Sequence, residues 1–235
     1  MGDRVNLIVR ALVISSLLLA FNQGFAQDYP HAFPRLGVTQ LLENERVFIW
    51  EVIWPNGEPQ PYHRHQYDMT GVFLRWGPLR VTRLDGSYTD SLEPFEIPNV
   101  FFLEKGVTHK EEGIGMPERH SIMIDIKEYS IPASARLGDG NTKIESGVGV
   151  QLLENERLIV NRIELGAGQS LAPHYHGEDS VLIFLSQGAL GLIGDDGSQE
   201  LKGMMRKDVW YLPRGQLHSL EAVGGPADVM LYKLK

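Results

Sequence analysis

QLLENER stands at residues 40–46 and returns unchanged at residues 151–157, 111 positions later. An identical match of seven residues indicates an internal duplication. The same shift aligns further residues, and beyond Ser87 the second copy is two residues shorter, so that the shift becomes 109. The aligned pairs are Gly57 with Gly168, His63 with His174, His65 with His176, Asp68 with Asp179, Gly77 with Gly188, Gly106 with Gly215, and His109 with His218. We therefore expect two similar domains in tandem, and for the heptapeptide itself a structural role in strand entry or an ion pair.

Both halves carry the residue pattern of β-strands. The segments VFIWEVIW (47–54) and LIVNRIEL (158–165) are rich in β-branched and aromatic residues and end at Pro or Gly turn signals. The Asp-Gly pairs at 85–86 and 196–197 lie between extended segments and indicate tight hairpins. Short strand-like runs with almost no helical period are typical of an all-β sandwich or barrel.

Residues 1–26 have the features of a secretory signal peptide. Arg4 and Arg10 precede the apolar run at 11–21, and small residues stand at positions −3 and −1 of a cleavage site after Ala26. The apolar run is shorter than the roughly 20 residues needed to cross a bilayer. We expect a periplasmic or secreted mature chain with no stable membrane anchor after cleavage. Its parts would be a first domain at 27–129, a Ser-, Gly- and Pro-rich linker at 130–142, and a second domain at 143–235.

The composition narrows the classes of partner and of chemistry. The 30 acidic residues outnumber the 22 basic ones, giving a net charge of −8, which argues against a nucleic-acid binder. The chain has no Cys, so disulfides, iron–sulfur clusters and thiol nucleophiles are excluded, and any metal must have nitrogen or oxygen ligands. The expected partner is a small-molecule substrate or ligand, and a homo-oligomer is compatible with the sequence.

Six of the eight histidines occupy equivalent positions in the two halves. In each half two of them form a His-x-His pair, and the strand period of two places both imidazoles on one face. If a later strand that carries the third histidine folds back beside the pair, three nitrogens surround one point and leave positions open, as in catalytic metal centres. The predicted metal ligands are His63, His65 and His109 in the first half and His174, His176 and His218 in the second. His31 and His120 have no counterpart and are interpreted as surface or loop histidines.

These motifs resemble the cupin superfamily, here in tandem as a bicupin. The resemblance implies two jelly-roll barrels, each a double-stranded β-helix. The first cupin motif, Gly-x5-His-x-His followed later by Gly, is matched in both halves. The second motif, Pro-x-Gly-x-x-His, is complete at Pro213, Gly215 and His218, whereas Glu104 replaces the proline in the first half. Because both motifs are more complete in the second half, we expect the better candidate site there.

One departure from the family concerns the carboxylate ligand. Metal-binding cupins usually add a Glu four or five residues after the second His of the pair, and neither half has a carboxylate at those positions. The nearest acidic residues are Asp68 and Asp179, three residues after the pair. Three interpretations stay open: each Asp ligates the metal, orients an imidazole from outside the ligand set, or caps the turn to the next strand.

The resemblance also implies a cofactor and an activity. The cofactor is a divalent metal, with Fe(II) or Mn(II) favoured and Zn(II), Ni(II) or Cu(II) also suited to imidazole ligands. Protons compete for imidazole near its usual pKa of about 6.5, so this reasoning predicts loss of metal below about pH 6. The implied function is an exported, metal-dependent oxidoreductase of the non-haem dioxygenase type acting on a small organic acid or enolisable compound. The alternatives are an isomerase, lyase or decarboxylase that uses the metal as a Lewis acid, and a non-catalytic module that binds a small molecule or metal.

The sequence assigns no catalytic side chain. The candidates for lining a substrate pocket are aromatic residues beside the His pairs or in a later strand, namely Tyr62, Tyr67, Tyr175 and Trp210.

Overall fold

The computed structural model describes residues 28–128, 149–194 and 196–235. The predicted leader at 1–26 and the predicted linker at 130–142 lie outside the described residues. The chain divides into two compact units, residues 1–30 and residues 31–235. Of the first unit only residues 28–30 are described, and they have no regular secondary structure. No helix among the described residues has the length and apolarity needed to cross a bilayer.

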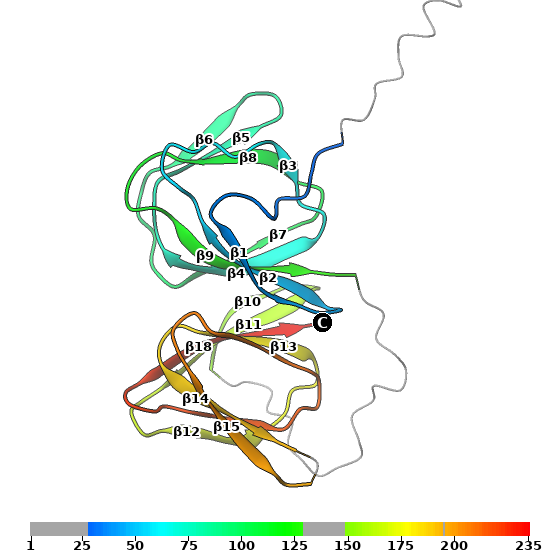
Figure 1. Cartoon of the computed structure of the whole chain (residues 1–235), viewed down its shortest axis with the longest axis vertical. Helices are drawn as coiled ribbons and strands as arrows, with labels where there is room; N and C mark the ends of the chain where they lie inside the picture. Colours follow the sequence, from blue (N-terminus) through cyan, green and yellow to red (C-terminus); the bar gives the residue numbers. More distant parts are fainter. Residues whose placement is uncertain (1–27, 129–148, 195) are drawn as a thin grey trace, which may run out of the picture. The chain divides into compact units, whose positions relative to one another are not determined.

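The first half of the larger unit consists of two antiparallel sheets (Figure 1). One sheet has the strand order β1-β2-β9-β4-β7 and the other has the order β3-β8-β5-β6. The strands are β1 (Val38–Glu43), β2 (Val47–Ile53), β3 (His63–Arg64), β4 (Asp68–Arg75), β5 (Leu79–Arg83), β6 (Tyr88–Ser91), β7 (Asn99–Leu103), β8 (Thr108–Gly113) and β9 (His120–Ile126).

The second half repeats this topology strand for strand. Its sheets have the orders β10-β11-β18-β13-β16 and β12-β17-β14-β15, which are the first two orders with every number raised by nine. The strands are β10 (Val150–Glu154), β11 (Leu158–Leu165), β12 (Ser170–His174), β13 (Asp179–Phe184), β14 (Gly188–Ile193), β15 (Gln199–Met204), β16 (Val209–Leu212), β17 (His218–Glu221) and β18 (Ala227–Leu234). The prediction of an all-β fold built from two jelly-roll barrels is confirmed.

The Asp-Gly hairpins form as the sequence predicts. Gly86 and Gly197 have φ values of 82° and 78°, in the left-handed region that glycine adopts without strain. Asp85 Oδ1 accepts the Ser87 amide at 2.9 Å, and the equivalent Asp196 Oδ1 accepts the Ser198 amide at the same distance. These turns join β5 to β6 and β14 to β15, so each outer hairpin has its register fixed by its turn.

The five-stranded sheets of the two halves share one hydrophobic core. Its buried side chains come from β2, β4 and β9 in the first half and from β11, β13 and β18 in the second, and include Ile49, Ile122, Ile124, Val160, Ile183 and Tyr232. Two further clusters fill the interior of the individual barrels. Because the largest cluster draws on both halves, the two barrels stabilise each other through their five-stranded sheets.

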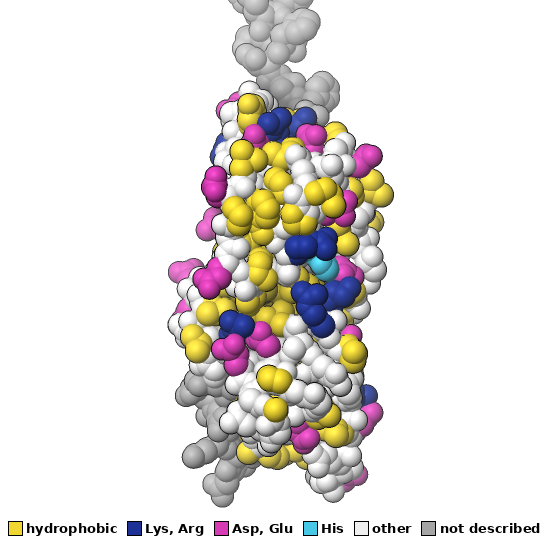
Figure 2. Space-filling view, turned by 90° about the vertical axis from the view of Figure 1, so that its left-hand side faces the viewer, with side chains coloured by type: hydrophobic (Ala, Val, Ile, Leu, Met, Phe, Trp, Pro, Cys, Tyr) yellow, Lys and Arg dark blue, Asp and Glu magenta, His cyan; other side chains and the backbone are white. Residues whose placement is uncertain are grey.

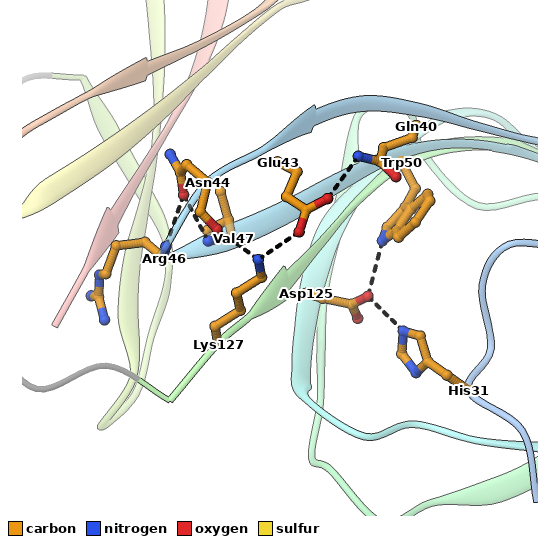
Figure 3. Close-up of polar contacts among 9 residues, drawn as sticks. All are labelled: His31, Gln40, Glu43, Asn44, Arg46, Val47, Trp50, Asp125 and Lys127. Carbon is orange, nitrogen blue, oxygen red and sulfur yellow. Dashed lines mark hydrogen bonds and ion pairs between the residues drawn. The ribbon is translucent and has the colours of Figure 1, made fainter.

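The repeated heptapeptide forms the hairpin at the start of each barrel. Asn44 Oδ1 accepts the amides of Arg46 at 2.8 Å and Val47 at 3.0 Å, so its side chain closes the turn between β1 and β2 (Figure 3). Asn155 makes the same two hydrogen bonds, also at 2.8 and 3.0 Å, with the amides of Arg157 and Leu158. The predicted structural role of this motif is confirmed.

Candidate metal centres

The three predicted histidines of the first half come together where β3 and β8 pair. His63 in β3 is the direct register partner of His109 in β8, and His65 follows β3 by one residue. The three ligand nitrogens lie within 4.8 Å of one another, and the Nε2 atoms of His65 and His109 are 3.2 Å apart. Two nitrogens that bind one ion at about 2.1 Å each, at an angle near 100°, are about 3 Å apart. The spacing therefore suits a single metal ion.

The second half repeats this arrangement on β12 and β17. His174 is the register partner of His218, and His176 follows β12. Their ligand nitrogens again lie within 4.8 Å of one another. In both barrels the strand that carries the third histidine runs antiparallel beside the strand of the His-x-His pair. The sequence prediction of a triad depended on this arrangement.

Hydrogen bonds fix the tautomer of several of these histidines. The Nδ1 atoms of His63, His174 and His218 lie 3.1, 2.9 and 2.9 Å from the carbonyl oxygens of residues 61, 172 and 216. Since a carbonyl can only accept, Nδ1 carries the proton and Nε2 keeps its lone pair. The Nε2 atoms of these three residues and of His176 are buried and have no hydrogen-bond partner. A divalent ion at the centre of each triad would satisfy them, so both donor sets fit such an ion.

Burial favours the neutral, metal-binding form of five triad histidines, namely His63, His65, His109, His176 and His218. Desolvation is the main cause that lowers the pKa of His63 and of His218 to about 4. The same cause, with the neighbouring imidazoles, lowers the pKa of His65 and of His176 to about 3. Histidine contributes only a small patch to the molecular face shown in Figure 2. The expectation of metal loss below about pH 6, which rests on the usual imidazole pKa, is therefore corrected to a lower pH.

We expect the metal-free protein to lose stability steeply as the pH falls below about 6.5. The folded-state pKa values of about 3–4 lie below that of an unfolded histidine, so in acid the unfolded chain binds more protons and is favoured. Each of the four buried histidines then costs on the order of 3 kcal/mol by about pH 4. Urea unfolding of chelator-treated protein between about pH 7.5 and pH 5 measures this effect.

The double variant His65→Gln, His176→Gln is the control for this pH dependence. It removes two of the titrating groups and should flatten the slope of unfolding free energy against pH. A urea midpoint that stays constant over this range in the unaltered protein would contradict the prediction.

The glycine of the second motif connects the third histidine to the pair. Gly106 and Gly215 have φ values of 91° and 76°, which disfavour any other residue. The Gly106 amide donates to the His65 carbonyl at 2.7 Å, and the Gly215 amide donates to the His176 carbonyl at 3.0 Å. This hydrogen bond places the loop before the third histidine against the end of the His-x-His segment.

Asp68 and Asp179 are engaged with the opposite barrel. Asp179 Oδ2 lies 3.1 Å from Nε of Arg46, and Asp68 Oδ2 lies 2.9 Å from Nε of Arg157, so the two heptapeptide arginines make reciprocal ion pairs. The other carboxylate oxygen of each Asp accepts a backbone amide of the second-motif loop, from Lys105 or residue 214, at 3.0 Å.

The contacts of Asp68 and Asp179 bear on the three interpretations of these residues. Neither Asp belongs to a group of converging ligand atoms, and neither hydrogen-bonds an imidazole, in the part of the chain that the structure describes. The backbone hydrogen bonds of both aspartates cap the second-motif loop, whereas the capping interpretation concerned the turn between the His pair and the next strand. The ion pair across the two barrels is a role that the sequence analysis did not include.

Two charged residues that the sequence analysis missed lie beside the first triad. Glu111 Oε1 is 3.7 Å from His109 Nε2, and Glu111 Oε2 accepts hydrogen bonds from Arg35 Nη2 at 2.6 Å and from Trp54 Nε1 at 2.8 Å. Burial by itself would raise the pKa of Glu111, but the Arg35 guanidinium and the other neighbours hold it well below its usual range. Glu111 is therefore an anion inside the barrel.

The sequence contained a signal for Glu111 but none for Arg35. Glu111 stands two residues after His109 in β8, so the strand period places both on the same face. Its equivalent in the second half, at the shift of 109, is Leu220. Arg35 precedes β1 in a segment without regular strands, and no spacing connects it with Glu111.

The predicted pocket aromatics are scattered. The Tyr62 hydroxyl donates to the Arg83 carbonyl at 3.0 Å. The Tyr67 ring packs against His31 with the centroids 5.5 Å apart. Tyr175, between the two histidines of the second pair, is half-buried. Trp210 lines a surface groove of about 510 Å³ whose lining includes none of the triad histidines.

The two histidines without counterparts lie within hydrogen-bond distance of carboxylates outside the triads. His120, in β9, is 8% exposed, and its Nε2 lies 2.8 Å from Glu51 Oε1, so its interpretation as a surface histidine is wrong. His31 is half-buried in the loop before β1, with Nε2 3.0 Å from Asp125 Oδ2 (Figure 3).

Comparison with known proteins identifies the fold but no near relative. No family model and no curated protein matches the chain. A cupin 2 conserved barrel domain protein from Leptotrichia buccalis is 15% identical, with a TM-score of 0.52 over 84% of this chain and 88% of that one. AerE from Microcystis aeruginosa is 12% identical, with a TM-score of 0.64 over 88% and 99%.

Oxalate decarboxylase from Bacillus subtilis, a protein with Mn(II) centres, is also similar in structure. It is 12% identical, with a TM-score of 0.57 over 87% of this chain and 78% of that one. These neighbours share the tandem arrangement of strands described above over most of their lengths. The chain therefore has the fold of a tandem bicupin.

Proposed function

We propose that the protein is an exported, divalent-metal-dependent enzyme of the non-haem dioxygenase type that converts a small organic acid or enolisable compound. The observation that carries this proposal is the pair of converging histidine triads, in which four of the six Nε2 atoms have no hydrogen-bond partner. Three protein ligands leave coordination positions open to a substrate, which a purely structural site would fill. Fe(II) or Mn(II) are the favoured ions, and either would supply Lewis acidity and redox chemistry when bound.

The first barrel is the better candidate for the reaction, in contrast to the expectation from motif completeness. Among the described residues, Arg35 and Glu111 form a buried ion pair beside the first triad, whereas Leu220 and Leu165 occupy the positions equivalent to Glu111 and Trp54 in the second half. Buried charged groups can bind and orient a polar substrate. The apolar side chains of Leu220 and Leu165 cannot form hydrogen bonds or ion pairs with one.

A decarboxylase that uses the metal only as a Lewis acid is the second candidate. Two observations favour it: the similarity to the fold of oxalate decarboxylase and the ionised Glu111 carboxylate 3.7 Å from His109. A carboxylate held as an anion beside the metal position can accept a hydrogen bond from a protonated substrate acid and orient it.

Oxygen dependence separates these candidates. Protein loaded with Fe(II) or Mn(II) is incubated with a panel of small organic acids while oxygen uptake and products are recorded. We expect oxygen uptake that matches substrate loss, abolished by His63→Ala and retained by His174→Ala. Turnover that is unchanged without oxygen would favour the decarboxylase, and recovery of every acid intact would favour a non-catalytic binding module.

Export rests on the features of residues 1–26. The full-length chain expressed with its own leader should yield a mature protein that begins at Gln27. Intact-mass measurement of the exported fraction tests this, and recovery of the uncleaved chain would contradict it.

A further inference from the structure

We propose that the first barrel, and not the second, binds a small carboxylate through the guanidinium group of Arg35, with Glu111 holding that group in place. This inference rests on the proposed function and names the chemical class of its ligand and the residue that selects it.

Arg35 has a donor left over in a place closed to water. Its side chain is 7% exposed, and one terminal nitrogen, Nη2, is bound to Glu111. The other terminal nitrogen, Nη1, is buried and has no hydrogen-bond partner. A buried charged donor without a partner lowers the stability of the folded state, and an acceptor bound to Nη1 would remove this cost. A carboxylate is the acceptor that suits a guanidinium best, in geometry and in charge.

The guanidinium is fixed from three sides. Its Cζ atom lies 5.4 Å from the centroid of the Phe33 ring and 5.8 Å from that of Trp54. Glu111 Oε2 binds Nη2, and the same oxygen accepts the Trp54 indole N–H. A side chain held by two rings and an ion pair loses little conformational freedom on binding a ligand. The guanidinium is thus held in one orientation, with Nη1 as its donor without a hydrogen-bond partner.

Glu111 connects the guanidinium with the triad. One of its oxygens binds Arg35, and the other lies 3.7 Å from Nε2 of His109. A ligand that occupies an open metal position through one oxygen group can therefore present a carboxylate to Arg35. The bound ion and the guanidinium would both attract the anion.

The second barrel shows that the fold does not need this charged pair. Leu220 replaces Glu111 at the equivalent position and is 1% exposed, and Leu165 replaces Trp54. Because well-packed apolar side chains serve at least as well as a buried ion pair for stability, stability alone does not account for Arg35 and Glu111. Carboxylate binding gives them a role that the second barrel lacks.

The test measures malonate binding and metal content separately. Protein loaded with Mn(II) is titrated with malonate by calorimetry, with the uncharged malonamide as the matched probe, and bound manganese is measured by elemental analysis. We expect malonate but not malonamide to bind, with binding retained in His174→Ala. In the His174→Ala background, the double variant Arg35→Met, Glu111→Leu should keep its manganese and bind malonate about tenfold more weakly or worse.

The double variant removes both charges, so no unpaired ion is left in the barrel. If it does not fold, the single variant Arg35→Lys keeps a positive charge to pair with Glu111 but has one terminal nitrogen in place of two, and should weaken malonate binding roughly threefold or more. Unchanged malonate affinity in a folded variant of either kind overturns the proposal, as does the absence of malonate binding in the unaltered protein. Failure of the first triad to load Mn(II), with Arg35-dependent malonate binding intact, would instead overturn the proposed function alone.

Discussion

Replacing Arg46 with alanine should lower the free energy of unfolding by about 3 kcal/mol, because it removes the nearer of the two guanidinium groups beside the buried carboxylate of Asp179. The two side chains are 6% and 9% exposed, with Nε and Oδ2 3.1 Å apart. Arg46 Nη2 also lies 3.3 Å from the Leu234 carbonyl. The variant therefore loses contacts that join the first barrel to the second. Urea unfolding at neutral pH measures the change.

Two variants control for this effect. Arg157→Ala breaks the reciprocal pair with Asp68, but Arg157 is 31% exposed, so water can replace it and the loss should be clearly smaller. The double variant Arg46→Met, Asp179→Asn removes both charges and keeps an acceptor for the residue 214 amide. It should recover most of the lost stability. Equal losses for Arg46→Ala and Arg157→Ala would contradict the assignment of the effect to burial.

The protein should bind two divalent ions per chain, and His65→Ala and His176→Ala should each remove one of them. Each variant keeps two of the three imidazole ligands of its triad. Its metal affinity should fall by more than the 10–100-fold that is typical when a residue hydrogen-bonded to a ligand is mutated. Elemental analysis after reconstitution with Mn(II), Fe(II), Ni(II) or Zn(II) gives the stoichiometry. Metal present at about 1,000 times its Kd should also stabilise the fold by about 4 kcal/mol for each site that it fills.

His120→Ala is the matched control, since His120 is a buried histidine outside both triads. It should keep both ions. Less than about 0.2 ion per chain in the reconstituted parent protein would show that the triads do not act as metal sites.

The sequence alone predicted the elements that follow from local pattern and duplication. The strand period of two places His63 and His65 on one face, and the hairpins return His109 to their side. Each predicted ligand has an equivalent histidine in the other half, whereas His31 has none. The repeat therefore distinguishes the ligands from His31. Fold and triads were therefore accessible without a structure.

Contacts between distant segments were not accessible. Arg35 meets Glu111 across 76 positions, from a segment whose path no periodicity defines. Asp68 and Asp179 appeared beside the His pairs, so the sequence suggested roles at the metal. Their partners, Arg157 and Arg46, come from the other half, and only the packing of the two barrels brings them together.

The reciprocal arginine–aspartate contacts have a consequence for how such a chain could have arisen. Each half presents the same arginine donor and the same aspartate acceptor, and each donor reaches the acceptor of the other half. A contact of this kind is isologous, the type that a two-fold axis generates between identical subunits. A lone ancestral barrel could thus have paired with its own copy through this surface before duplication and fusion made the pairing permanent within one polypeptide.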